Sequence, residues 1–512
     1  MSASHERWAS TLIRRARLVP VRSPAPSQEP VDIRVRDGTV REVASGLRPA
    51  GDERVVDAAG RWAIPGLWDQ HVHMAQWAQT LVRLDVGGTT DPAQVTRKVE
   101  QGLAQLPASR RGTFLFGFGY RSGAWSRRPT VGELDAVSED HPVVLISGDA
   151  HNGWVNSRAL ELLGLAPRTG PLSENEWFGV FARLGDLPGA EEGTDAAYRK
   201  AVAAAVGRGV VGIVDMEFGA GYLDWPERLA HGVDQLRVRA ATYPDRLEEV
   251  VAAGLRSGHE LPGGGGLLTM GPLKIISDGS LNTRTAYCRE PYVDLTSGDF
   301  PRGKQNYSLH ELTDLLHRAR RFGLVVAVHA VGDAAAASAL DAFAATGAAG
   351  SIEHAQLMTP DDVTRMGRLG VLASVQPAHL LDDRDVTEQC WPDRADRCFP
   401  LRSLLNAGVT LALGSDAPVS RLDPWLAMAA AVHRSADQRQ PWNPGQSLTA
   451  AEALAASTDG QGTVAVGSRG DVVLLDDDPL RDFDDPAATA AHLRGMPVAA
   501  TVVAGRATYL SL

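Results

Sequence analysis

The stretch AIPGLWDQHVH (residues 63–73) is the first of eight runs that decide the fold class of this chain. It is a short apolar run, typical of a buried strand, and it ends in two histidines. Seven more short apolar runs follow along the chain. They are VVGIVDM (210–216), LRVRAATY (236–243), PLKIISDG (272–279), VVAVHA (325–330), SIEHAQ (351–356), VLASVQP (371–377) and VTLALGSD (409–416). Apolar strands that alternate with helical stretches are typical of βα units, and eight such units close a barrel. We therefore predict an α/β protein with a (β/α)8 barrel.

The two ends of the chain have a different pattern from the middle. Residues 1–61 and 461–512 both carry short apolar or alternating runs, and we expect them to build one small β-sandwich domain together. The barrel is expected to span residues 62–460. Within it, residues 75–195 contain strand-like runs of their own and predict an inserted α/β subdomain at the barrel mouth, where loops carry the chemistry of barrel enzymes.

The composition narrows the class of protein. A formal net charge of −11 argues against a nucleic-acid binder and against binding to anionic membranes. No stretch of the sequence approaches the ~18 apolar residues of a membrane span, and the N-terminus lacks the apolar core of a secretory signal. The three irregularly spaced cysteines fit a reducing compartment better than a disulfide framework. We expect a cytoplasmic protein that acts on a small molecule.

Side chains that can bind a metal end five of the eight predicted strands. They are His71, His73, Lys274, His329, His354 and Asp416. His71 and His73 stand two residues apart, so both imidazoles point to the same side of a strand. Each residue alone has an ordinary structural explanation, as a core histidine, a turn aspartate or an ion-pair lysine. A closed barrel brings all the strand ends to one face, and the joint pattern predicts a metal centre.

Lysine is scarce in this chain, since only four of its 51 basic residues are lysine. Lys274 therefore stands in an apolar strand for a specific reason. Its primary amine can form a carbamate with CO2 and so provide an anionic bridging ligand, which an arginine cannot do. Divalent ions, zinc or a similar metal, lower the pKa of bound water from about 15.7 to roughly 7. The sequence predicts two such ions, with Asp416 as the group that carries the proton.

Four further residues are candidates for contacts with the substrate. His379 follows a barrel strand, and His151 follows a strand of the insertion. Trp125 could line an aromatic pocket or belong to the core of the inserted subdomain. Arg284 could bind a carboxylate of the substrate or form a salt bridge within the protein.

Several motifs together resemble the amidohydrolase superfamily. They are IPGLWDQHVH (64–73), LKIISDGSLNTRTA (273–286), VVAVHAVGDAA (325–335), SIEHAQ (351–356) and LALGSDAPV (411–419). They look most like the branch that includes N-substituted formamide deformylases and relatives of D-aminoacylase. The resemblance extends into the insertion and the C-terminal tail, so it covers nearly the whole chain.

The resemblance implies a binuclear metal centre with defined ligands. His71, His73 and Asp416 would bind the more buried ion, and His329 and His354 would hold the second. The lysine carbamate would bridge the two ions. Relatives in this branch are often homodimers.

The expected activity is hydrolysis of a C–N bond in a small linear amide, an N-acyl compound or an N-formyl compound. Because a fold does not determine the substrate, deamination, cyclic amide hydrolysis or lactone hydrolysis on the same centre stays open as an alternative. A non-catalytic binding protein on this fold is the remaining alternative.

Overall fold

The computed structural model describes residues 10–512 with several gaps. The gaps are residues 26, 28, 52, 107–111, 123–124, 139, 149–151, 182, 185–193 and 295–299. The chain forms two compact units, one made of Met74–Ala201 and a larger one made of Met1–His73 together with Val202–Leu512. No helix of the described residues combines the length and the apolar character needed to cross a membrane.

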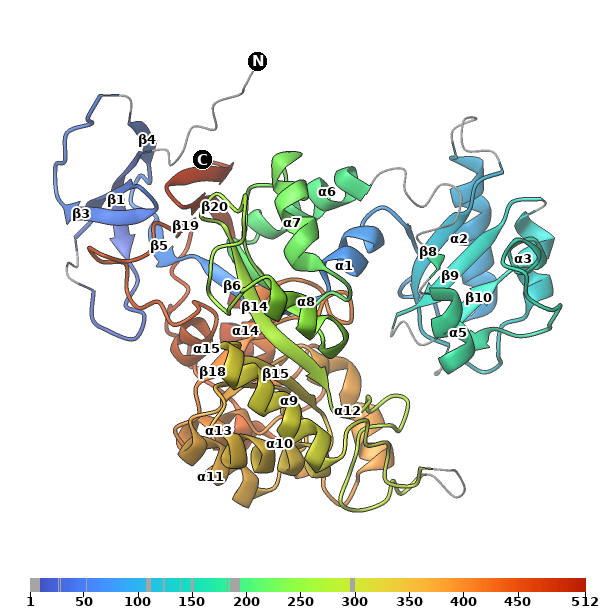
Figure 1. The fold of residues 1–512 in the computed structure, drawn as a ribbon. Helices are drawn as coiled ribbons and strands as arrows, with labels where there is room; N and C mark the ends of the chain where they lie inside the picture. The colour runs from blue at the N-terminus through green and yellow to red at the C-terminus, as the bar shows by residue number, and fades with distance from the viewer. Residues whose placement is uncertain are drawn as a thin grey trace. The chain divides into compact units, whose positions relative to one another are not determined.

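The larger unit contains a barrel of eight parallel strands, which confirms the predicted fold class (Figure 1). In their order around the barrel, the strands are β6 (Leu67–Val72), β12 (Val210–Asp215), β13 (Arg237–Thr242), β14 (Leu268–Ile276), β15 (Val326–Ala330), β16 (Gly350–His354), β17 (Leu372–Val375) and β18 (Leu411–Leu413). Each of the eight predicted runs forms one of them. Their residues are nearly all buried, because helices and side chains cover both faces of the closed sheet.

The barrel closes where β6 meets the residues that follow β18. The Asp416 N–H donates to the carbonyl of His71 at 2.7 Å, and the His73 N–H donates to the carbonyl of Ala417 at 2.9 Å. Val72 and Ala417 form a parallel bridge between these two hydrogen bonds. The seam therefore places the two histidines of the first strand beside the aspartate that follows the last strand.

Helices cover the outside of the barrel, and α9 (Leu309–Phe322) shows how the sequence encodes them (Figure 1). Ser308 and Glu311 form a capping box at its start, and Gly323 ends it at φ 77°, a conformation that glycine adopts freely. Its buried residues follow the helical period and form one face toward the barrel: Leu312, Leu315, Leu316 and Ala319.

The larger unit contains further helices, which differ in how they begin and end. They are α7 (Gly221–Ala230), α8 (Leu247–Ala252), α10 (Asp333–Thr346), α11 (Pro360–Leu369), α12 (His379–Cys390), α13 (Leu401–Asn406), α14 (Pro424–His433), α15 (Ala450–Ala456) and α16 (Pro486–Arg494), with short 3-10 helices η4 (Pro244–Arg246), η5 (Ala395–Arg397) and η6 (Pro444–Gln446).

Strands from both ends of the chain form the small β-sandwich. In sheet order they are β21 (Arg506–Leu510), β20 (Val498–Val503), β19 (Val472–Leu475), β5 (Trp62–Pro65), β1 (Thr11–Leu18), β2 (Val31–Arg36) and β3 (Thr39–Ala44), and β4 (Arg54–Asp57) pairs with β1. Strand β1 bends at Arg15, whose φ is 58°, so that its first half pairs with β2 and its end pairs with β5. Strand β1 joins β2 and β3 on one side to β5 and the C-terminal strands on the other. Residues such as Ile33 and Leu474 therefore share one apolar core.

The unit Met74–Ala201 is built around its own five-stranded sheet. In sheet order its strands are β11 (Leu172–Ser173), β10 (Asn152–Val155), β9 (Val143–Ser147), β8 (Leu115–Tyr120) and β7 (Leu84–Asp85). Its helices are α1 (Met74–Thr80), α2 (Pro92–Ala104), α3 (Val131–Ser138), α4 (Ser157–Leu162) and α5 (Glu174–Phe181), and α6 (Thr194–Val206) leads back to the barrel sequence. The mixture of helices and strands agrees with the predicted inserted α/β subdomain.

A tryptophan of the histidine-bearing strand β6 packs against a glycine of the neighbouring strand β12. The indole of Trp68 lies over Gly212, where an added Cβ would stand 2.4 Å from Trp68 Cε2. On the same ring, the guanidinium carbon of Arg239 lies 4.2 Å from the centroid and that of Arg469 lies 5.1 Å from it. Because the Trp68 indole covers position 212 of β12 so closely, only glycine fits there.

We expect Gly212→Ala to lower the free energy of unfolding by about 1–3 kcal/mol, since overpacking a closely packed site forces its neighbours to move. Urea denaturation followed by circular dichroism measures the change. Gly445→Ala is the matched control, because a Cβ at that position meets nothing within 4 Å. Equal denaturation midpoints for Gly212→Ala and the wild type would contradict the packing argument.

Candidate metal centre

Six side chains that can bind metal meet at the carboxyl ends of the barrel strands. They are the six predicted ones: His71, His73, Lys274, His329, His354 and Asp416. The Lys274 Nζ lies 3.2 Å from the Nε2 of His71. Oδ1 of Asp416 lies 3.5 Å from the Nε2 of His71 and 3.4 Å from the Nε2 of His73. The structure thus brings together residues from five strands that are far apart in the sequence.

The remaining two imidazoles lie against this group. The ring centroid of His354 is 5.1 Å from that of His71 and 4.5 Å from that of His329. Burial and the nearby Lys274 lower the pKa of His329 to about 3, and burial together with His329 holds the pKa of His354 well below its usual value. Both imidazoles are therefore neutral at physiological pH, which is the form that binds a metal ion.

Asp416 carries the negative charge of the centre. Burial by itself would raise the pKa of this carboxyl, but the electrostatic interaction with His71 and a hydrogen bond from His73 hold the pKa well below its usual range. Asp416 is 8% exposed, so few of its interactions are screened by water. Its carboxylate is ionised and faces three histidines.

Lys274 is buried, and burial lowers the pKa of its amine from the ordinary value against the opposing charges of Glu353 and Asp416. An ammonium group loses its hydration there, so the neutral amine becomes more accessible. A neutral primary amine is the form that reacts with CO2. The surroundings of Lys274 are therefore compatible with a carbamate at this position.

Glu353 is a residue of the centre that the sequence analysis did not identify. Its Oε2 lies 2.7 Å from the Nδ1 of His71, and its other oxygen accepts a hydrogen bond from Ser351. Burial would raise the pKa of Glu353, but the hydrogen bond and charge of His71 and the charge of Lys274 lower it overall. By accepting the Nδ1–H, Glu353 keeps the Nε2 of His71 free to face Lys274 and Asp416. The available signal was an acidic residue inside an otherwise apolar strand.

The backbone explains how Glu353 and His354, which are neighbours in one strand, both reach the centre. Successive side chains of a strand normally point to opposite sides. His354 has a φ of 71° and Ala355 a φ of 44°, so the alternation ends there. Asp416 has a φ of 56°. Positive φ values are uncommon for residues other than glycine, and they concentrate at functional sites.

The donor groups fit divalent cations. His71, His73 and Asp416 each offer a ligand atom, and these atoms lie within 4.8 Å of one another. His354, His379 and Asp416 form a second such group. Buried neutral imidazoles with one shared carboxylate are typical ligands of zinc and similar ions. The site thus offers two groups of donor atoms for a metal ion, and Asp416 belongs to both.

His379, which the sequence analysis left as a candidate for substrate contact, lies at the centre. It begins helix α12 and is buried, and its Nε2 stands 3.9 Å from Oδ2 of Asp416. Its ring is nearly parallel to that of His354, with centroids 6.0 Å apart. Among the described residues its Nε2 has no hydrogen-bond partner, although it is shielded from water. Such an atom is expected to have a partner that binds to the site.

Asp278 is a second residue that the sequence analysis missed. Its carboxylate accepts the N–H groups of Tyr287, Val331 and Gly332 at 2.9, 3.1 and 2.8 Å. Oδ1 also lies 3.4 Å from the Nε2 of His329. Burial raises the pKa of Asp278 to about 7, against the lowering effect of these backbone groups. Asp278 therefore ties the loop after β14 to the loop after β15, next to a candidate ligand.

The other predicted contact residues have partners within the protein or lie outside the described part. The Nε and Nη2 of Arg284 donate to one oxygen of Asp294 at 3.1 and 2.6 Å, so its guanidinium is held in a salt bridge. Trp125 packs in the core of the inserted unit, with its ring centroid 6.5 Å from that of Trp154. His151 lies outside the described residues.

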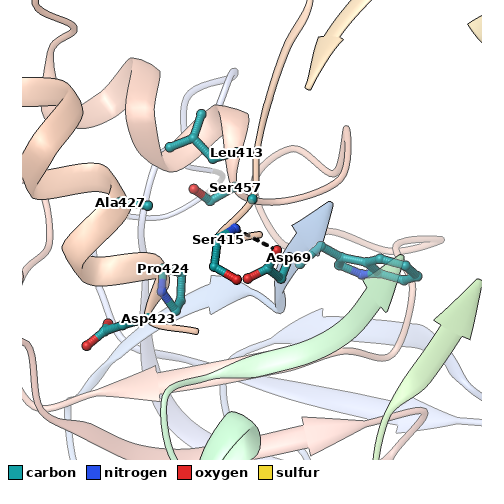
Figure 2. A pocket seen from close by; sticks show the side chains of 9 residues that line it. Asp69, Leu413, Ser415, Asp423, Pro424, Ala427 and Ser457 are labelled. Atoms are coloured by element: carbon teal, nitrogen blue, oxygen red, sulfur yellow. Dashed lines mark hydrogen bonds between the residues drawn. The ribbon is translucent and has the colours of Figure 1, made fainter. Parts of the chain in front are cut away.

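A small cavity adjoins the barrel seam rather than the metal centre. Its volume of about 10 Å³ has room for about one water molecule. Figure 2 shows Asp69 and Ser415 side by side in its wall. Oδ1 of Asp69 accepts the N–H of Ser415 at 2.9 Å and the N–H of His71 at 3.1 Å. This carboxylate joins β6 to β18 beneath the histidine pair, and the cavity is too small for a substrate.

Comparisons with known proteins agree with this arrangement. The sequence model of the amidohydrolase family matches residues 54–509. Protein LONG AFTER FAR-RED 3 of Arabidopsis thaliana is 27% identical, over 93% of this chain and 88% of that protein. N-substituted formamide deformylase of Arthrobacter pascens is 26% identical, over 92% of each chain.

A solved structure shares the fold over almost the same length. An uncharacterized metal-dependent hydrolase from Pyrococcus horikoshii superposes with a TM-score of 0.76 at 25% identity, covering 93% of this chain and 99% of that one. Because the family match spans most of the sequence, this chain belongs to the amidohydrolase family and has the fold of a metal-dependent hydrolase.

Proposed function

We propose that this hydrolase cleaves the C–N bond of a small linear amide, an N-acyl compound or an N-formyl compound. The observation that carries the proposal is the ionised carboxylate of Asp416 among buried imidazoles that can hold divalent ions. Similarity to a protein named for the deformylation of N-substituted formamides supports this class of substrate.

The chain offers ligands for two ions. His71, His73 and Asp416 would hold one ion, and His329 with His354 would hold the other, with the carbamylated lysine of β14 between them. Bound divalent ions of this kind supply a water molecule of lowered pKa and polarise a carbonyl oxygen. The protein contributes the positions of the donor atoms, because each one extends from the end of a buried strand.

Asp416 would move the proton. Its Oδ1 faces the Nε2 atoms of His71 and His73, whereas its Oδ2 faces His379. Oδ2 is therefore the oxygen that accepts a proton from the attacking water and delivers it to the leaving nitrogen. The Nε2 of His379 would contact the substrate from the same side, where it can form the hydrogen bond that it lacks within the protein.

A substrate panel tests the reaction class. We expect the zinc-loaded protein to release amine from N-methylformamide or another linear amide. A variant with both His71→Ala and His73→Ala should lose its metal and at least roughly a hundredfold in activity, because even groups that only orient ligands are worth about 10–100-fold. Elemental analysis and amine release are the measurements.

The matched control for the double variant is His310→Ala, since His310 lies on the exposed surface of α9. Release of ammonia from an amino-substituted ring, or turnover of a lactone alone, would favour the alternative reactions. Metal content and activity that survive in the double variant would refute the assigned centre.

Lys274→Arg keeps a positive charge but removes the primary amine. We expect this variant to bind fewer than two ions per chain and to lose hydrolysis, whereas Lys304→Arg on the exposed surface should change neither. After equilibration with ¹³C-bicarbonate, the wild type should show a carbamate carbon signal by NMR that is absent in Lys274→Arg. Full activity in Lys274→Arg would exclude a bridging carbamate.

Glu353→Gln replaces the carboxylate that holds the Nδ1–H of His71 by a neutral amide. Loss of such an outer partner costs about 10–100-fold in metal affinity or activity, and we expect a decrease in that range. Metal affinity by competition with a chelating dye measures it. Ser351→Ala, which removes only the second hydrogen bond to Glu353, should have a smaller effect; equal effects would mean that His71 is oriented in another way.

A further inference from the structure

An exposed aromatic side chain stands directly beside the metal centre. Phe218 follows strand β12 by three residues and is 56% exposed. Its ring centroid lies 5.8 Å from that of His73, one of the candidate ligands. On its other side the ring stacks on Tyr243, with centroids 4.9 Å apart and an angle of 29° between the planes. We call Phe218 and Tyr243 the aromatic wall.

The backbone and side chains around the aromatic wall are firmly connected to the barrel. The Tyr243 hydroxyl donates to the carbonyl of Met216 at 2.6 Å, and the Met216 N–H donates to the carbonyl of Val72 on strand β6 at 2.7 Å. The N–H of Phe218 donates to the carboxylate of Glu217 at 3.0 Å. The ring of Phe218 therefore rests on a residue that is anchored to the barrel, Tyr243, and lies beside His73, although much of the ring faces solvent.

An aromatic ring held in this way gains from a further apolar contact. Exposed aromatic surface is unfavourable, and its burial against another apolar group is driven by the release of water. The side chain of His73 is only 15% exposed, and the ring of Tyr243 already stacks on Phe218. A further apolar contact with Phe218 therefore has to come from a group that is not part of the barrel. A group attached to the scissile bond at the metal centre would lie within reach of Phe218.

The charges near the aromatic wall are negative. Burial raises the pKa of the Tyr243 hydroxyl most, and the carboxylates outside the metal centre that raise it further are those of Glu217, Asp215 and Asp245. Arg246, next along the chain, donates to both carboxylate oxygens of Glu249 at 2.9 Å. A carboxylate on the substrate that lay against Phe218 would meet the like charge of Glu217, whose carboxylate accepts the Phe218 N–H at 3.0 Å, and would lose its hydration, whereas an uncharged group would lose nothing of this kind.

We propose that the aromatic wall receives the organic substituent of the substrate, and that it selects an uncharged aromatic or branched apolar group and rejects one that carries a carboxylate. The inference rests on the proposed function, because it names the substituent of the same amide substrate. It favours simple N-substituted amides over N-acylated amino acids.

Three substrates isolate the two parts of the proposal. N-formylphenethylamine and racemic N-formylphenylalanine differ by one carboxylate, and N-methylformamide lacks the aromatic group. The wild type should show the highest kcat/KM with N-formylphenethylamine. Phe218→Ala should lower the ratio of kcat/KM for N-formylphenethylamine to that for N-methylformamide roughly tenfold, within the range that apolar pockets achieve. Phe218→Leu should retain part of the ratio.

One further variant serves as a control, and another tests the effect of the negative charge. Leu223→Ala removes an apolar side chain of α7 that is 60% exposed, and it should leave the ratio unchanged. Glu217→Gln should raise kcat/KM for N-formylphenylalanine severalfold relative to N-formylphenethylamine, since it removes a like charge. An equal loss of kcat/KM for N-formylphenethylamine and N-methylformamide in Phe218→Ala would overturn the proposal. So would a wild type that prefers N-formylphenylalanine to N-formylphenethylamine.

Failure of the proposed function can be told apart from failure of this inference. If the metal-loaded wild type hydrolyses none of the three compounds, the amide reaction is refuted. Saturation-transfer NMR with N-formylphenethylamine and the metal-free protein then tests the aromatic wall by binding alone. Saturation of the phenyl protons by the wild type and Leu223→Ala, but not by Phe218→Ala, supports the wall, and equal saturation by all three overturns it.

Discussion

The seam between β6 and the residues after β18 is the contact on which the metal centre depends. Two backbone hydrogen bonds, from Asp416 to His71 and from His73 to Ala417, hold the first and last strands together, and the carboxylate of Asp69 adds one more across the same seam by accepting the Ser415 N–H. Closure brings the Nε2 atoms of His71 and His73 close to the same carboxylate oxygen, Oδ1 of Asp416. A barrel left open at this edge would keep the same residues and have no shared centre.

Burial determines the chemistry of the groups that the seam collects. In a medium of low dielectric constant the imidazoles of His329 and His354 lose their protons, and burial lowers the pKa of the Lys274 amine. Asp416 stays ionised because it lies beside His71 and His73. Glu353 orients His71 by its Nδ1–H, as carboxylates behind metal-binding histidines commonly do. His71 thus has a partner at each of its two ring nitrogens, Glu353 at Nδ1 and Lys274 at Nε2.

The surface next to the centre adds a different property. The ring of Phe218 stacks on Tyr243, which is hydrogen-bonded to the carbonyl of Met216, and it offers an apolar contact beside His73. The carboxylates nearby disfavour an anion. Chemistry would thus depend on the strand ends of the barrel, whereas discrimination among substrates would depend on the residues immediately after those ends, as is usual in barrel enzymes.

The sequence by itself determined the eight barrel strands and the six residues at their ends, because periodicity and apolar runs are local properties that a single chain displays. It did not reveal Glu353, since strand alternation places that residue opposite His354 and only the φ of 71° at His354 brings both to the centre. It left Arg284 open between two partners, and the fold pairs it with Asp294. The contact of Phe218 with His73 likewise joins strands β12 and β6, and such non-local contacts exist only once the barrel has closed.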